Sequence, residues 1–300
     1  MEIAVEIATR YARRPLGMFG IVTDKYLTKA HEAFNELNFH PMSSKDMDED
    51  AFIKAAVKTL NHTKDLADAQ DCVRMIQFCL KDFDKIAKAI DKHAEEWASM
   101  PFEGNDLLSI VDDDEAAGTY FVTNGIEKNG KEIYLSSIAF GDEEMYVFER
   151  KGNKYTLGDD SPYYIKPSAM TSTKMKLYGK DDGKLANIVL SKDMNVFLEN
   201  NKTGVDIVIN DGEMDIYSQE YLGSIPEDGY IEGKNMFACI EWDILDKDSK
   251  VGVAKITNFS DSIDIDLILI IAASTFLLFK RYLDAQTATN IAIMSSWARR

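Results

Sequence analysis

An uncharged apolar run near the C-terminus limits the possible folds more than any other feature of the sequence. Residues 267–279 read LILIIAASTFLLF, without a charge, and Lys280 and Arg281 follow at once. A helix of this length rises roughly 20 Å, whereas the hydrocarbon core of a bilayer is about 30 Å thick. The run therefore predicts a helix buried in protein, and a helix that is apolar on every face needs protein all around it.

Short predicted strands precede this run. From residue 119 onward apolar residues alternate with a period of two, and turn sequences such as Asp182-Gly183 recur between them. The predicted strands are residues 120–123, 132–139, 145–150, 163–166, 174–178, 185–190, 196–198, 205–209, 214–217, 236–244 and 251–256. About a dozen antiparallel strands before one apolar helix predict a closed β-barrel around a central helix, which we place at residues 266–283.

The N-terminal third has a helical period instead. Apolar residues recur at steps of three or four in the stretch 63–97, and further helices are expected at about 26–37 and 47–60. Three or four helices of this length predict a small bundle. The pattern ends at Met100-Pro101 and a polar stretch follows, so we expect two domains, a helical one at residues 1–112 and the barrel at 113–300. The fold class is then α+β.

Three segments carry a resemblance to a known family. They are residues 175–190 (MKLYGKDDGKLANIVL), 207–218 (IVINDGEMDIYS) and 258–279 (NFSDSIDIDLILIIAASTFLLF). Between about residues 132 and 284, the order of many strands, an Asp-rich link and an apolar helix resembles the tubby-like superfamily. This group includes tubby proteins, phospholipid scramblases and LURP-one-related proteins. The resemblance implies a barrel around a central helix and a function in lipid-headgroup sensing or lipid movement, without a shared catalytic site.

Asp261, Asp264 and Asp266 form a candidate calcium site just before the apolar run. The segment is similar to an acidic stretch of scramblases that the resemblance links to calcium. Ca²⁺ usually takes six to eight oxygen ligands and a glycine-assisted turn, and neither is evident here. The simpler interpretation is that Asp266 caps or charges the helix N-terminus while Asp261 and Asp264 face water.

Lys174, Lys176 and Lys180 form a candidate lipid-binding site in the strand-rich part. Residues two apart on a strand point to the same face, so Lys174 and Lys176 could meet one anionic headgroup together. Asp181 and Asp182 follow at once and weaken the local potential. An ordinary solvated strand face is the alternative.

Enzymatic chemistry is not expected. His31, His40, His62 and His93 all fall in the helical part without a metal-binding or catalytic spacing. Phosphate-binding glycine loops are absent, and the acidic pairs are adjacent residues in loops, which do not focus two carboxylates on one substrate atom. The three cysteines lack metal-ligand spacing and are expected to be buried thiols in a reducing compartment, so no cofactor is predicted.

Charge narrows the class of partner. A net charge of −17 excludes general nucleic-acid binding, which depends on dense lysine and arginine. The amino terminus lacks the layout of a secretory signal and no transmembrane segment is predicted, so we expect a cytoplasmic protein, with peripheral membrane contact still open. The tail after Asp284 has apolar residues at helical spacing, which indicates either a continuation of the core helix that packs on the N-terminal bundle or an amphipathic helix for a partner or membrane.

Three functions are compatible with this pattern. The first is a non-enzymatic binding or scaffolding protein whose partner is an unknown protein or lipid. The second is a membrane-associated protein that binds phosphoinositides or other phospholipids. The third is an acidic inhibitor or immunity-type protein that neutralises a basic partner, as the charge of −17 suggests.

Overall fold

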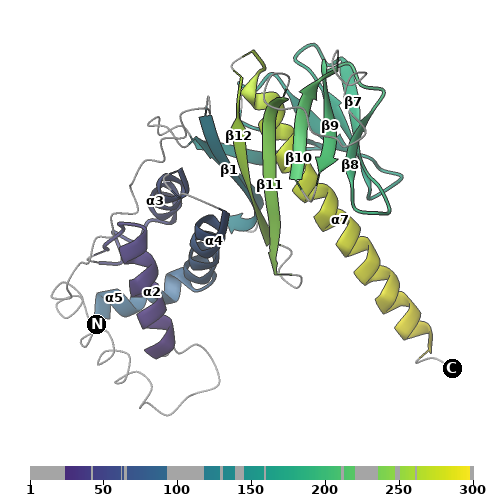
Figure 1. Ribbon diagram of the computed structural model, residues 1–300. Coiled ribbons are helices and arrows are strands. Elements are labelled where there is room, and N and C mark those ends of the chain that lie inside the picture. The colour runs from purple at the N-terminus through teal and green to yellow at the C-terminus, as the bar shows by residue number, and fades with distance from the viewer. Residues whose placement is uncertain are drawn as a thin grey trace. The chain divides into compact units, whose positions relative to one another are not determined.

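The chain forms two units, Met1–Asp112 and Asp113–Arg300, in a computed structural model. The structure describes residues 24–41, 43–61, 63, 66–92, 118–128, 131–138, 145–158, 160–210, 213–219, 236–246, 251–260 and 262–297. Figure 1 shows helices in the first unit, and strands with one long helix in the second.

The helical unit packs around aromatic side chains. Its described helices are α2 (Asp24–Glu36), α3 (Glu49–Asn61), α4 (Leu66–Lys81) and α5 (Phe83–Lys92). Phe34, Phe39 and Phe52 meet edge to face with ring centroids 5.5 to 5.7 Å apart, and Phe83 joins them from α5. The periodic stretch 63–97 covers α4 and α5, which are separated at Asp82; residues 93–97 lie outside the described residues.

Every strand except β4 falls on a segment that the alternating pattern predicts. The strands are β1 (Gly118–Lys128), β2 (Lys131–Ile138), β3 (Met145–Lys151), β4 (Lys154–Thr156), β5 (Tyr164–Pro167), β6 (Lys174–Tyr178), β7 (Lys184–Leu190), β8 (Val196–Glu199), β9 (Val205–Asn210), β10 (Glu213–Ser218), β11 (Met236–Asp246) and β12 (Val251–Asn258). The short β4 follows the turn at Gly152, which has a positive φ of 65°.

The strands form two antiparallel sheets that meet at β3. The first half of β3, Met145 to Phe148, pairs with β2, and the second half, Glu149 to Lys151, pairs with β4. The complete order is β8-β7-β6-β5-β4-β3-β2-β1-β12-β11-β10-β9. A strand that changes sheets in this way makes a corner, so the strands bend around a shared interior.

The prediction of a closed barrel is wrong. β8 and β9 are the two ends of the strand order, and no pairing joins them among the described strands. The strand count and the all-apolar helix suggested closure of the sheet, and the resemblance implied it. The strand count and the helix do not specify whether the first and last strands pair.

Side chains of the β8–β9 connection explain why the order stops at β9. The Gln219 N–H donates to the Gly204 carbonyl, so Val205 and Ile207 direct their backbone groups to the free edge. The Val205 carbonyl accepts from Asn201 Nδ2 at 2.5 Å, and its N–H donates to Thr203 Oγ1 at 3.3 Å. The Ile207 N–H donates to Asp206 Oδ1 at 2.9 Å. Polar side chains thus occupy three of the edge groups that β8 would pair with in a closed barrel.

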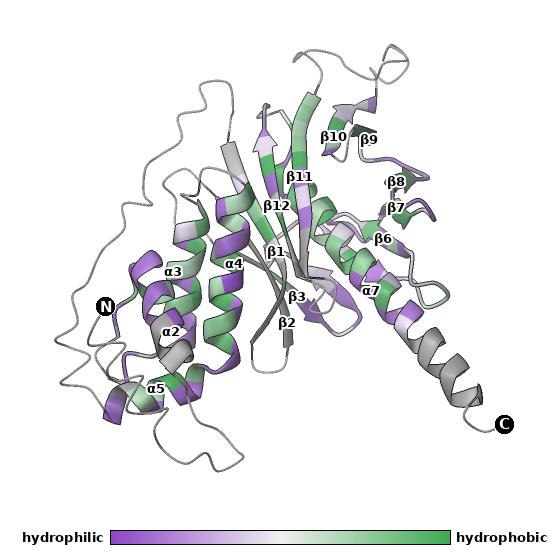
Figure 2. Ribbon diagram, turned by 60° about the horizontal axis from the view of Figure 1, so that its bottom comes forward, coloured by the Kyte–Doolittle hydropathy of each residue, from purple (hydrophilic) through white to green (hydrophobic). Residues whose placement is uncertain are grey.

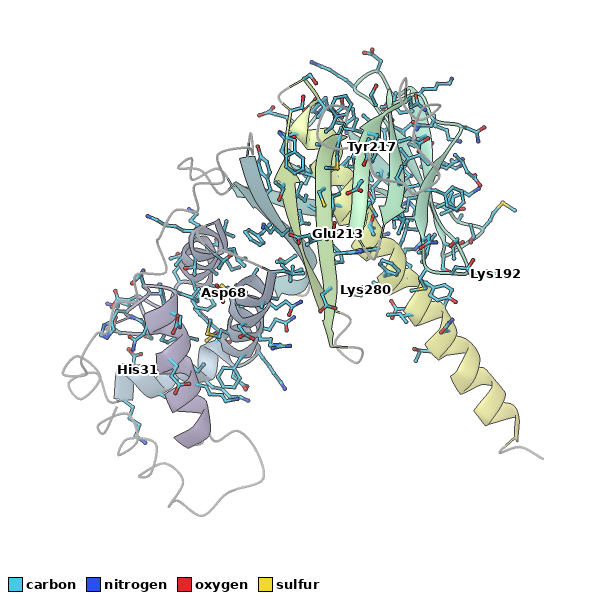
Figure 3. All side chains as sticks on the ribbon, in the orientation of Figure 1. His31, Asp68, Lys192, Glu213, Tyr217 and Lys280 are labelled. Atoms are coloured by element: carbon cyan, nitrogen blue, oxygen red, sulfur yellow. The ribbon has the colours of Figure 1, made fainter. Side chains whose placement is uncertain are left out.

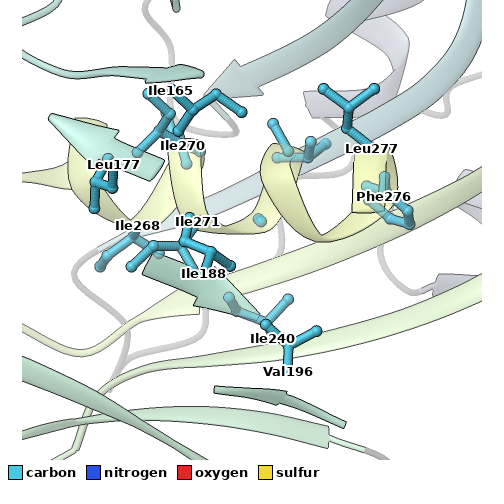
Figure 4. Close-up of a cluster of buried hydrophobic side chains, with 14 of the residues drawn as sticks. Ile165, Leu177, Ile188, Val196, Ile240, Ile268, Ile270, Ile271, Phe276 and Leu277 are labelled. Atoms are coloured by element: carbon cyan, nitrogen blue, oxygen red, sulfur yellow. The ribbon is translucent and has the colours of Figure 1, made fainter. Parts of the chain in front are cut away.

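Helix α7 (Ile265–Trp297) fills the interior of the bent sheets. Its residues Leu267 to Phe279 are buried, and they pack on inward-facing strand residues such as Ile165, Ile188 and Ile240 (Figure 4). The hydrophobic part of α7 lies along the strands in Figure 2. The tail after Asp284 continues this helix without a break, as one of the two interpretations of the sequence predicts, so α7 extends past residues 266–283; side chains beyond Thr287 lie outside the described part of the chain.

Candidate functional site

The predicted lysines Lys174 and Lys176 lie on the outer face of β6. Met175 and Leu177, which alternate with them, are buried in the core that contains α7, while Lys176 is exposed. Lys174 donates to Glu199 Oε2 on β8 at 2.6 Å, and this bond holds the pKa of the Glu199 carboxyl below its usual value. One of the two strand lysines is therefore already paired with an acid.

Strand pairing places further cations beside them. Lys166 on β5 is directly opposite Lys176, and Tyr164 is directly opposite Tyr178. The two tyrosine rings stack with centroids 4.9 Å apart and planes 7° apart. We call the outward-facing set on β4 to β7 the lysine–tyrosine face, which consists of Lys154, Tyr164, Lys166, Lys174, Lys176, Tyr178 and Lys184.

The tyrosine pair organises the charges of this face. Lys154 Nζ lies 4.0 Å from the centre of the Tyr164 ring, and Lys166 Nζ lies 5.0 Å from that of Tyr178. Asp182 accepts from the Tyr164 hydroxyl at 2.6 Å and from Lys154 Nζ at 3.5 Å. Partial desolvation and then the bond to Asp182 raise the pKa of Tyr164 to about 12, and the same bond lowers the pKa of Asp182.

An anion fits the chemistry of this face. Like charges directly opposite each other on a sheet repel, so the pair Lys166 and Lys176 is unfavourable without a counter-ion. Five lysines lie on the face, whereas two carboxylates of the described residues, Asp182 and Glu199, form ion pairs with them. The third predicted lysine, Lys180, is exposed in the β6–β7 turn beside Asp181, which offsets its charge.

The acidic segment before α7 has a structural role in the described residues. Asp264 Oδ1 accepts from the Asp266 N–H at 3.1 Å, so the residue that caps the helix is Asp264 rather than Asp266. Asp266 is partly buried in the first turn of α7, and burial raises the pKa of its carboxyl despite a hydrogen bond with Ser161. Asp261 lies outside the described residues. Calcium binding here stays a prediction, and a rise in melting temperature on adding Ca²⁺ would be its signature.

A second group of polar side chains lies on β10 and β11. Glu213, Asp215 and Cys239 form the one group of three His, Cys, Asp or Glu side chains, among the described residues, whose ligand atoms all lie within 4.8 Å of one another. Cys239 is the direct cross-strand partner of Asp215, and its thiol donates to Glu213 Oε2 at 3.5 Å. Burial and the two carboxylates raise the pKa of this thiol, so it stays protonated.

The other residues considered as sites are scattered. His31 lies buried in α2 and His40 follows that helix, while His62 and His93 lie outside the described residues. Cys72 and Cys79 are buried thiols of α4, and burial raises the pKa of each to about 12. These residues belong to the unit Met1–Asp112, whereas the lysine–tyrosine face belongs to the unit Asp113–Arg300.

Comparison of the chain with protein families, with curated proteins and with solved structures found no match. The resemblance to tubby-like proteins therefore stays a prediction as far as function is concerned. Within the described helices, α7 included, none meets the length and apolarity that crossing a membrane requires. The lysine–tyrosine face keeps Lys174 and Lys176 of the predicted lysine site and adds Lys154, Lys166, Lys184 and two tyrosines, which only strand pairing could reveal.

Proposed function

We propose that this protein is a non-enzymatic binding module that attaches to membranes by holding an anionic phospholipid headgroup on its lysine–tyrosine face. The observation that supports this most is the direct opposition of Lys166 and Lys176, flanked by the stacked rings of Tyr164 and Tyr178. A phosphorylated headgroup would relieve the repulsion between the two ammonium groups. It would also accept hydrogen bonds from both of them.

Local charge can work against the net charge of −17 because salt shortens the range of electrostatics. The Debye length is about 8 Å at physiological ionic strength, so acids farther away are largely screened. A multivalent headgroup would then sense mainly the lysines that it touches. In the cytoplasm the face would meet the anionic lipids of the inner leaflet.

The double variant Lys166→Gln/Lys176→Gln tests the proposal. Each lysine close to an anionic surface contributes about 1 kcal/mol, so we expect roughly 30-fold weaker binding to vesicles that contain phosphatidylinositol bisphosphate. Co-sedimentation with these vesicles measures the loss, and higher salt should reduce the binding of the parent protein.

Lys54→Gln/Lys88→Gln is the matched control. Both lysines are exposed on the helical unit, and the substitution changes the net charge by the same amount. If both double variants lose vesicle binding to the same extent, the loss follows from the change in net charge and not from the lysine–tyrosine face. A parent protein that does not sediment with the vesicles even at low salt would disprove the proposal.

An acidic outer face on β10 and β11 favours a second function, the neutralisation of a basic protein. Glu213 on β10 shares this face with Glu241 and Asp243 on β11, whereas Asp215 on the same side of β10 is buried; Lys255 pairs with Glu241 at 3.6 Å. Attraction between this negatively charged face and a positively charged partner would raise the rate of association. A pull-down from the host should then recover a basic protein that salt releases. The variant Glu213→Gln/Glu241→Gln should fail to retain this protein, and equal recovery with the variant would count against the second function.

A further inference from the structure

One loop at the end of the lysine–tyrosine face exposes a large apolar side chain. Residues 168–173 connect β5 to β6, and Met170 at its tip has 97% of its surface exposed. Among the described residues, one other large hydrophobic residue is exposed, Phe197, with 38% of its surface in contact with solvent. An apolar side chain held in water at a loop tip is typical of a contact surface rather than of a core.

The loop satisfies much of its own backbone. The Ser168 N–H donates to the Lys174 carbonyl at 3.0 Å and closes the loop at its base. The Met170 N–H donates to Ser168 Oγ, and the Thr173 N–H donates to Thr171 Oγ1. A loop that enters a medium poor in water needs such internal partners, because each unpaired polar group is expensive to bury there.

Arg281 on α7 satisfies two of the loop carbonyls and one of β6, and so fixes the loop to the core. Its Nη2 donates to the Ser168 carbonyl at 2.9 Å and to that of Thr171 at 3.4 Å, and its Nη1 donates to that of Lys174 at 3.5 Å. The guanidinium is partly buried, which lowers its pKa but leaves it charged. The loop therefore presents Met170 on a fixed support.

Three lysines lie on the segments next to the loop, and one of them, Lys174, is paired with Glu199. Lys166 and Lys174 lie close to the two ends of the loop, and the Leu190 N–H donates to the Thr173 carbonyl at 2.9 Å. That bond brings the β7–β8 turn beside the loop, with Lys192 exposed at the end of the sheet from which α7 emerges (Figure 3). Phe197 is directly opposite Val189, which is in turn opposite Lys174.

We infer that the loop 168–173 is a membrane-insertion loop, in which Met170 enters the headgroup and acyl boundary of an anionic bilayer while the nearby lysines stay at the phosphates. The inference rests on the proposed function and adds to it a second, apolar contact with the lipid. An anionic lipid surface has negative phosphates above hydrocarbon. The lysines near the loop are complementary to the phosphates, and the apolar tip is complementary to the hydrocarbon. A protein groove would not need the loop backbone to be satisfied from within.

Met170→Ser tests the insertion. Since the side chain is exposed, the variant should fold and melt like the parent, but we expect about tenfold weaker binding to vesicles of phosphatidylcholine with phosphatidylinositol bisphosphate. Met170→Leu keeps an apolar tip and should bind like the parent. Binding of soluble inositol trisphosphate, measured by calorimetry, should be equal in the parent and in both variants.

Two outcomes separate this inference from the proposed function. If Met170→Ser binds vesicles as tightly as the parent, insertion is disproved and headgroup binding stands. If the parent binds neither vesicles nor inositol trisphosphate, both are disproved. Met170→Trp gives a further measurement, because brominated lipids quench the fluorescence of tryptophans that enter the bilayer. Stronger quenching in this variant than in the parent would support insertion, and equal quenching would count against it.

Discussion

Ile270→Asp is expected to abolish folding of the unit Asp113–Arg300. Ile270 is fully buried on α7, in the cluster that Ile165, Leu177 and other strand residues complete (Figure 4). The substitution removes apolar burial and leaves a carboxyl group with no solvent in the middle of the core. The combined loss exceeds about 4 kcal/mol, a large part of the 5 to 15 kcal/mol that stabilises an ordinary domain.

Gln286→Asp provides the control on the same helix. Gln286 is exposed about two turns beyond the buried part of α7, so the same new carboxyl group should change stability by no more than about 0.5 kcal/mol. Circular dichroism and denaturant titration measure both variants. An Ile270→Asp protein that keeps the parent's transition, and loses only its binding to vesicles, would show that this part of α7 is a membrane contact rather than a core.

The helix and most strands were predictable because their signals are local. A period of two identifies strands such as β6, and an uncharged run such as 267–279 predicts a buried helix at any point in a chain. Closure of the sheet depends instead on the edge of β9. Backbone groups of Val205 and Ile207 at this edge form hydrogen bonds with the side chains of Asn201, Thr203 and Asp206. No periodic pattern marks such contacts, which explains why the barrel prediction failed.

The candidate site was predictable only within one strand. Lys174 and Lys176 could be assigned to a common face because they are two residues apart. Lys166 and Lys176 are opposite each other only because the loop 168–173 sets the register of β5 and β6. The contribution of Lys154 was missed for another reason, since β4 has three residues and is too short for an alternating pattern.

Gly252→Ala is expected to destabilise the same unit through a single methyl group. Gly252 lies on β12 opposite Ile244 of β11, with α7 on its inner side. A Cβ atom at this position would lie 2.6 Å from the Asp243 carbonyl oxygen and 2.8 Å from Cε1 of Phe276. Phe276 is itself buried, so neither the strand backbone nor the ring can give way freely. We expect a loss of about 3 kcal/mol in the free energy of unfolding.

Gly183→Ala separates this steric effect from the general effect of replacing a glycine. Gly183 lies in the β6–β7 turn, and a Cβ atom there would have no neighbour within 4 Å, so the stability of the Gly183→Ala protein should differ from that of the parent by less than about 0.5 kcal/mol.

The double variant Gly252→Ala/Phe276→Leu tests the contact with α7. Its loss of stability should be about 1 kcal/mol smaller than the sum of the losses in the two single variants, because the smaller side chain removes one of the two clashes. Additive losses would mean that α7 does not pack against β12 at this point, and the account of the core built on α7 would then be wrong.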